Sequence, residues 1–156
     1  MPSTLKETFA GKRVFLTGHT GFKGAWMTLI LNKLGAQVKG YALEPKNNFD
    51  LYNQLEGNSL CDSVIADIRD RQKLKDVILE FQPDFVFHFA AQALVLDSYK
   101  EPVETYETNV MGTIHVLDAL RSLNQPCYSV IITTDKVYEN MEVLRPYPET
   151  ARFGGY

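Results

Sequence analysis

The sequence has few of the residues that build disulfide frameworks or metal sites. Its two cysteines, Cys61 and Cys127, lie far apart and form no C-x-x-C pair, which suits free thiols in a reducing cytoplasm better than a disulfide framework. The histidines His19, His88 and His115 are scattered along the chain as well. We therefore expect a cytoplasmic protein that has no metal centre.

Long apolar runs and a surplus of basic charge are also missing. No apolar stretch approaches the length of a membrane span, and residues 1–12 are mixed and polar, without the apolar core of a signal peptide. Lysine and arginine number 16 against 19 acidic residues, which gives a net charge of −3. Neither nucleic acid nor a membrane is an expected partner of such a chain. A length of 156 residues favours one domain with a real core.

A glycine-rich stretch at residues 17–24 (T-G-H-T-G-F-K-G) is the most informative segment. Gly18, Gly21 and Gly24 directly follow the apolar residues 13–16 and are spaced G-x-x-G-x-x-G. In a dinucleotide-binding turn, the first glycine permits a tight strand-to-helix turn, the second lets the backbone approach a pyrophosphate, and the third lets the helix pack on the strand. The alternative is an ordinary glycine-rich turn, but the flanking patterns favour a cofactor site at a helix N-terminus.

Strand-like and helix-like apolar patterns alternate along the chain. Strands are expected at about 13–17, 37–42, 63–66, 85–89 and 129–133. Helices are expected at about 22–34 and at about 102–123. A further helix should begin after an N-cap at Asp70 and end before Pro83. Residues 45–58 are expected to form a loop, with or without a short helix. This alternation predicts an α/β fold, a Rossmann-like doubly wound parallel sheet of about five strands, with residues 1–156 forming one NAD(P)-binding domain.

Ligands of such a sheet bind beyond the carboxyl ends of the strands. Glu44 follows the second strand and could accept hydrogen bonds from the adenosine ribose, or be a solvated loop carboxylate. Asp67 follows the third strand and could accept a hydrogen bond from the adenine amino group, unless it and Asp70 only serve the helix start. Small residues, Ala90 and Ala91, follow the fourth strand and allow close approach to the cofactor. The complete candidate set for cofactor binding is Gly18, His19, Gly21, Phe22, Lys23, Gly24, Glu44, Asp67, Ile68, Ala90, Ala91, Gln92 and Thr133.

Three reactive side chains follow the fifth strand in succession: Thr134, Asp135 and Lys136. A hydroxyl can orient a substrate alcohol, a carboxyl group can shuttle a proton, and a lysine can act as a base. Spacing alone is equally consistent with a simple surface turn. His88 and His115 are expected to be structural, with His88 a buried histidine whose hydrogen bonds are satisfied.

Several of these segments together resemble the extended short-chain dehydrogenase/reductase superfamily. Residues 17–24 match its T-G-x-x-G-x-x-G fingerprint. The segments that resemble nucleotide-sugar-modifying members are 82–92, 106–113 and 134–136. More narrowly, the glycine turn, residues 98–102 and residues 135–140 are similar to the CDP-glucose 4,6-dehydratase family. The resemblance runs through nearly the whole chain and corresponds to the N-terminal portion of such an enzyme.

The resemblance implies a lyase that converts CDP-glucose to CDP-4-keto-6-deoxyglucose through a transient NADH. Thr134 would position the C4 hydroxyl, Asp135 would protonate the departing C6 hydroxyl, and Lys136 would take the C5 proton. NAD is the implied cofactor, and NADP is left open because His19 and Lys23 could meet a 2′-phosphate.

The sequence departs from the family pattern at later motifs. No tyrosine within residues 1–156 has a lysine four positions later. The family's Tyr-x-x-x-Lys pair and substrate domain are therefore absent, and we expect this chain alone to be inactive. Leu96 stands where members often have arginine. The helix at 102–123 would help to build a homodimer of the complete enzyme. Alternative functions are another dTDP-, GDP- or UDP-sugar dehydratase or epimerase, and a non-catalytic dinucleotide-binding module.

Overall fold

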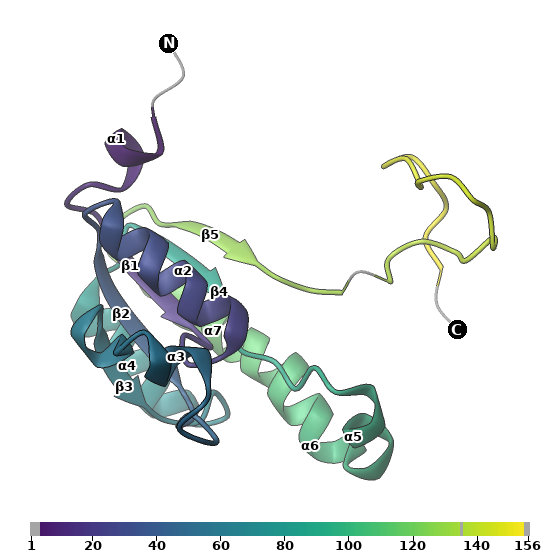
Figure 1. The fold of residues 1–156 in the computed structure, drawn as a ribbon, viewed down its shortest axis with the longest axis horizontal. Helices are drawn as coiled ribbons and strands as arrows, with labels where there is room; N and C mark the ends of the chain where they lie inside the picture. Colours follow the sequence, from purple (N-terminus) through teal and green to yellow (C-terminus); the bar gives the residue numbers. More distant parts are fainter. Residues whose placement is uncertain (1–3, 135, 155–156) are drawn as a thin grey trace.

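A five-stranded parallel β-sheet forms the centre of the computed structural model, which describes residues 4–134 and 136–154 (Figure 1). The strands are β1 (Arg13–Thr17), β2 (Gln37–Ala42), β3 (Asp62–Ile65), β4 (Phe85–His88) and β5 (Tyr128–Ile131), in the spatial order β3-β2-β1-β4-β5. Every neighbouring pair is parallel. The sheet confirms the doubly wound α/β fold, and its switch point lies between β1 and β4.

The central strand β1 is buried on both faces, as its unbroken apolar run predicts. Val14, Phe15 and Leu16 are each 0% exposed. Successive side chains of a strand point to opposite faces. Phe15 accordingly packs in a core that includes Leu74, whereas Val14 and Leu16 pack in a second core with Leu31. The sheet therefore has a hydrophobic core on each face.

Helices cover both faces of the sheet. On one face lies α2 (Phe22–Lys33) with α3 (Leu51–Gln54) beside it, and on the other α4 (Arg71–Phe81) packs against α7 (Gly112–Leu120) (Figure 1). The shorter elements are α1 (Leu5–Phe9), η1 (Gly57–Ser59), α5 (Val95–Lys100), α6 (Pro102–Tyr106) and η2 (Glu107–Met111). The sequence patterns do not predict α1 or α5, because each is shorter than two helical turns and shows no helical period.

Helix α4 begins and ends where its sequence signals predict. The Asp70 carboxylate accepts a hydrogen bond from the Lys73 N–H at 3.1 Å and so caps the N-terminus. Leu74 and Ile78, one turn apart, are fully buried against the sheet. Gln82 adopts a left-handed conformation with a φ of 49° and ends the helix.

The helix predicted at about 102–123 differs from the structure in two ways. It contains a turn of π-helix, η2, between α6 and α7, and it ends at Leu120. After Leu120 the α-helical hydrogen bonds give way to a tighter turn, in which the N–H groups of Ser122 and Leu123 bond to carbonyl oxygens three residues back. The apolar period does not distinguish a π-turn from an α-helix, so the sequence pattern misses it.

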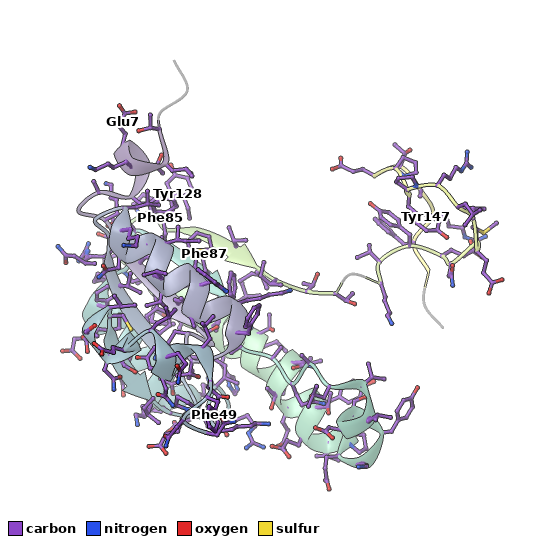
Figure 2. The ribbon with its side chains drawn as sticks, viewed as in Figure 1. Glu7, Phe49, Phe85, Phe87, Tyr128 and Tyr147 are labelled. Atoms are coloured by element: carbon purple, nitrogen blue, oxygen red, sulfur yellow. The ribbon has the colours of Figure 1, made fainter. Side chains whose placement is uncertain are left out.

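Residues 136–154 stand away from the sheet after β5 (Figure 1). The rings of Tyr138 and Tyr147 stack with their centroids 5.9 Å apart, and Phe153 stacks on Tyr138 at 6.0 Å. Figure 2 shows Tyr147 far from Phe85 and Tyr128, which stack on each other at 5.5 Å near α1. The segment therefore forms an aromatic cluster of its own, separate from both cores of the sheet.

Candidate cofactor and active site

The glycine turn between β1 and α2 makes two very close backbone contacts, one with the loop after β4 and one within the turn. Gly18 has a φ of +73°, a conformation that favours glycine, and a Cβ built on it would lie 2.7 Å from the Ala90 nitrogen. A Cβ on Gly24 would overlap the Gly18 carbonyl. The first and third glycines are thus required by packing within the protein, which agrees with the roles expected from the sequence.

Gly21 is different, because the protein itself does not need a glycine there. Its φ is −73°, and a Cβ built on it would meet only the Gly18 oxygen, at 3.4 Å. It is the N-cap of α2, and no side chain caps that terminus. The first N–H groups of a helix lack intrahelical partners and carry partial positive charge. A bare backbone at a helix N-terminus fits the pyrophosphate of a dinucleotide.

A cleft lies at the switch point of the sheet, beside this turn. Its walls come from the carboxyl ends of β1, β2, β3 and β4, with side chains from α6 and η2 at one side. The lining residues are Gly18, Thr20, Gly21, Tyr41, Ala42, Leu43, Ala66, Asp67, Ile68, Arg69, Phe89, Ala90, Ala91, Glu104 and Thr108. The tertiary structure thus brings together six of the predicted cofactor residues: Gly18, Gly21, Asp67, Ile68, Ala90 and Ala91.

Asp67 is held as a charged group at the edge of the cleft. Its carboxylate accepts bonds from the Arg69 backbone N–H at 2.8 Å and from the Arg69 guanidinium at 2.6 Å. These hydrogen bonds lower the pKa of Asp67. Arg69 also reaches Glu104 at 3.7 Å and Glu107 at 3.4 Å. Because Asp70 caps α4, Asp67 does not serve as the cap and faces the cleft instead.

Glu44 does not line the cleft but an adjoining hollow. That hollow shares Thr20, Gly21 and Leu43 with the cleft, and Lys46 also lines it. The Thr20 hydroxyl donates to the Leu43 carbonyl at 2.8 Å and so ties the glycine turn to the segment after β2. Phe49, also in the hollow, is 89% exposed and projects from its loop (Figure 2).

The side chain of His19 points away from the cleft, which corrects the expectation that it could meet a 2′-phosphate. It is 0% exposed, its Nε2 lies 2.7 Å from the Ser63 hydroxyl, and its ring packs edge-on against Tyr52. Burial lowers the pKa of His19 to about 4. A neutral, enclosed imidazole offers no charge to a phosphate, so only the backbone of His19 borders the turn. Phe22 and Lys23 are exposed on the first turn of α2.

Gln92 is bound up in contacts with the helix that carries the π-turn. The Asn109 side chain accepts from the Gln92 N–H at 2.8 Å and donates to the Gln92 carbonyl at 2.9 Å. The Gln92 amide nitrogen donates to the Thr105 hydroxyl at 3.1 Å. Gln92 therefore positions the loop after β4, and its side chain is not among those that line the cleft.

The predicted acid–base residues follow β5 at the same edge of the sheet. Thr133, Thr134 and Lys136 are exposed, and the Lys136 N–H donates to the Thr134 hydroxyl at 3.0 Å. Asp135 lies outside the described residues. Of the described residues in this segment, neither Thr133, Thr134 nor Lys136 lines the cleft.

A buried polar network lies beside the cleft, and the sequence patterns missed its two threonines, Thr17 and Thr113, though not its histidine. His88, 2% exposed, has Nδ1 at 2.7 Å from the Thr17 hydroxyl and Nε2 at 3.0 Å from the Thr113 hydroxyl. Both ring nitrogens are satisfied, as expected for this histidine, and burial lowers its pKa to about 4. The signal available in the sequence was a histidine inside an otherwise apolar strand.

Within the described parts of the chain, residues 4–134 and 136–154, no group of three His, Cys, Asp or Glu side chains is placed to hold a metal ion. In the same residues, no helix has the length and apolar character needed to cross a membrane.

The sequence matches the family model for GDP-mannose 4,6 dehydratase over residues 15–155. The chain belongs to this dehydratase family. It is 50% identical over 97% of its length to the CDP-glucose 4,6-dehydratase of Salmonella typhimurium, and spans 42% of that protein. It is 30% identical to a dTDP-glucose 4,6-dehydratase of Xanthomonas campestris, over 88% of this chain and 42% of the relative.

Solved structures share the dehydratase-family fold. The UDP-glucose-4-epimerase from Stenotrophomonas maltophila, described with bound NAD, superposes with a TM-score of 0.79 at 27% identity, covering 92% of this chain and 43% of that one. The UDP-glucose 4-epimerase from Brucella ovis, in complex with NAD, gives a TM-score of 0.78 at 25% identity, over 94% of this chain and 42% of that one. The chain thus spans about two fifths of these relatives.

We expect Gly21→Ala to weaken cofactor binding without unfolding the protein. The protein leaves room for the added methyl group, and the weaker N-cap costs about 1 kcal/mol at most. A pyrophosphate in van der Waals contact with Gly21 would be displaced, so the Kd for NAD should rise at least about tenfold. Calorimetric titration and thermal unfolding check both effects.

Gly18→Ala is the matched comparison, and it should lower the thermal midpoint more strongly because its methyl group meets backbone atoms of Phe89 and Ala90, directly after β4. Equal NAD affinity in Gly21→Ala and the wild type would contradict this assignment of the second glycine.

The two buried histidines should make the protein less stable as the pH falls. In the unfolded chain their pKa is about 6.5, whereas burial lowers the pKa of His19 and His88 to about 4. Between these values the unfolded state binds more protons, so the free energy of unfolding falls by up to about 1.4 kcal/mol per pH unit per histidine. Denaturant titrations from pH 7 to pH 4.5 measure this slope.

His88→Asn should reduce the slope, since one of the two contributing groups is gone. An unfolding free energy that stays constant between pH 6.5 and pH 4.5 would show that these imidazoles are not held neutral.

Proposed function

We propose that this chain is the cofactor-binding part of a nucleotide-sugar 4,6-dehydratase that converts CDP-glucose to CDP-4-keto-6-deoxyglucose. The observation that carries the proposal is the 50% identity, over 97% of the chain, to the Salmonella CDP-glucose 4,6-dehydratase. The cleft at the switch point supports it independently, because such clefts hold dinucleotides. Residues 1–156 act as a single NAD(P)-binding domain, and the complete enzyme carries its substrate domain elsewhere.

The residues of the cleft fit NAD. Gly21 and the N-terminus of α2 would hold the pyrophosphate. Asp67, beside Ile68, would accept a hydrogen bond from the adenine amino group. The small side chain of Ala90 would let the cofactor approach the backbone closely. When bound, the nicotinamide would supply the redox chemistry, taking a hydride from the sugar C4 and returning it to C6. NAD is proposed over NADP because His19 is enclosed and neutral, which leaves Lys23 as the cation on the first turn of α2.

The proton chemistry is assigned to the three residues after β5. Thr134 orients the C4 hydroxyl. Once C4 is a ketone, the C5 proton is acidic, and Lys136 takes it. The C6 hydroxyl leaves with a proton from Asp135, so that one molecule of water is lost and a C5–C6 double bond forms. A hydride returned to C6 and a proton returned to C5 would then saturate this bond. Acid–base catalysis of this kind contributes about 10²- to 10⁴-fold to a rate.

A homodimer of the complete enzyme is proposed through the outer face of the helix formed by α6, η2 and α7. Its apolar side chains are exposed in this chain: Val103, Tyr106, Val110, Met111, Ile114 and Leu117. A run of exposed apolar side chains of this kind marks an interaction surface.

A chimera tests the catalytic assignment. Residues 1–156 replace the corresponding part of the Salmonella relative, which is 50% identical, and formation of the 4-keto sugar from CDP-glucose is followed by NMR. We expect turnover by the chimera, none by the isolated chain, and a loss of at least about 100-fold in the chimera with Asp135→Asn. Glu142→Gln, an exposed carboxylate beyond the trio, is the control.

Unchanged turnover in the Asp135→Asn chimera would contradict the acid role. Epimerisation of a UDP-sugar by the complete native protein, tested alongside dehydration of CDP-, dTDP- and GDP-sugars, would instead favour the epimerase alternative.

The adenine assignment predicts discrimination between NAD and its hypoxanthine analogue. In the analogue an oxygen replaces the amino group, and the charged Asp67 can no longer accept a hydrogen bond from it. One lost bond to a charged group is worth about 1.5–3 kcal/mol, so NAD should bind at least about tenfold more tightly than the analogue. Asp67→Ala should bring the ratio close to one.

Glu107→Gln is the matched control, because Glu107 touches the same Arg69 without lining the cleft. Its ratio should equal that of the wild type, and a wild-type ratio near one would refute the adenine assignment.

A further inference from the structure

His88 joins the two sides of the cofactor cleft through its two ring nitrogens. On one side the ring meets Thr17, the last residue of β1, and on the other it meets Thr113 of α7. The loop after β4, residues 89–92, begins directly beyond His88, and its first three residues line the cleft. A buried, fully bonded side chain at this point can set the position of that loop.

Counting donors and acceptors assigns the donor in each of the two hydrogen bonds of His88. The Thr17 hydroxyl oxygen accepts from the backbone N–H groups of Phe89 and Ala90, each at 3.1 Å, and the Phe89 N–H is shared with the Thr17 carbonyl at 3.2 Å. With these two donors on the hydroxyl oxygen, its own proton points at His88 Nδ1. The neutral ring then carries its hydrogen on Nε2 and donates to Thr113, whose hydroxyl donates to the Asn109 carbonyl at 2.6 Å.

These hydrogen bonds form a relay that runs from Thr17 through His88 and Thr113 to Asn109. Asn109, at its far end, holds both the N–H and the carbonyl of Gln92. The cleft wall is therefore fixed at Phe89 and Ala90 by Thr17 and at Gln92 by Asn109, and His88 connects the two anchors. The backbone of Phe89 and Ala90 lies so close to Gly18 that a Cβ there would not fit, and the turn at Gly18 leads into the proposed pyrophosphate site.

We propose that His88 is a positioning residue for the cofactor, held as the Nε2–H tautomer so that Thr17 and Thr113 together fix the Phe89–Gln92 wall of the cleft. The inference rests on the proposed cofactor site. A histidine suits this place because a neutral imidazole presents one acceptor and one donor in opposite directions. An asparagine side chain can replace only the hydrogen bond that Nδ1 makes with Thr17, and a glutamine side chain only the one that Nε2 makes with Thr113.

Variants of the two flanking positions test this role in the full 156-residue chain. Loss of one buried hydrogen bond from the relay should weaken NAD binding roughly tenfold in Thr113→Val and in His88→Asn. Thr113→Ser keeps the hydroxyl and should restore wild-type affinity. His115→Asn is the matched control, because His115 contacts the Ile68 carbonyl and none of residues 89–92.

Two measurements without NAD decide the inference independently. Nitrogen-15 NMR of the imidazole should show His88 with its proton on Nε2 at pH 7, and the Phe89 and Ala90 amides should exchange with solvent faster in Thr113→Val than in Thr113→Ser. A proton on Nδ1, or equal exchange in these two variants, would overturn the proposal. So would NAD affinities within twofold of the wild type in both Thr113→Val and His88→Asn.

A wild-type chain that binds no NAD would refute the cofactor assignment. The tautomer and the amide exchange would still decide the position of His88 in the relay.

Discussion

The contact between Gly18 and the end of β4 is the constraint on which the rest of the site depends. It requires a positive φ and no side chain at Gly18, since any Cβ there would run into the Ala90 backbone. The contact brings the β1 turn and the β4 loop together at the switch point, where the sheet opens toward ligands. The N-terminus of α2 is then aimed across the cleft, because Gly24 rests directly on the Gly18 carbonyl.

Polar groups hold this contact from below, within a sheet that is otherwise apolar. Thr17 and His88 are both buried beside the fully enclosed Phe15 and Val86. Polar groups are tolerated in such a core only when every donor and acceptor has a partner. The relay from Thr17 to Asn109 meets that requirement, and it ends in the one π-turn among the described residues, a feature that often accompanies functional positions.

The chain has exposed apolar side chains on its edge strand and on one of its helices. Tyr128 and Val130 of the edge strand β5 are 71% and 46% exposed, and the outer side of α6 and α7 is apolar. The chain spans about two fifths of its relatives, and the helix surface is where a second subunit is proposed to pack. Thr134 and Lys136, which are proposed to take part in the proton chemistry, follow β5 along the chain and are exposed.

Local patterns in the sequence determined the sheet strands, the helix that Asp70 caps and the roles of Gly18 and Gly24. They suffice there because period, caps and glycine spacing act over a few residues. The tertiary structure alone decided that His19 turns inward toward Ser63, 44 residues away, and that His88 joins Thr17 to Thr113, 71 residues back and 25 ahead. It also separated Glu44 from the cleft and inserted the π-turn. Such partners become neighbours only when distant strand ends meet, and no local pattern carries that information.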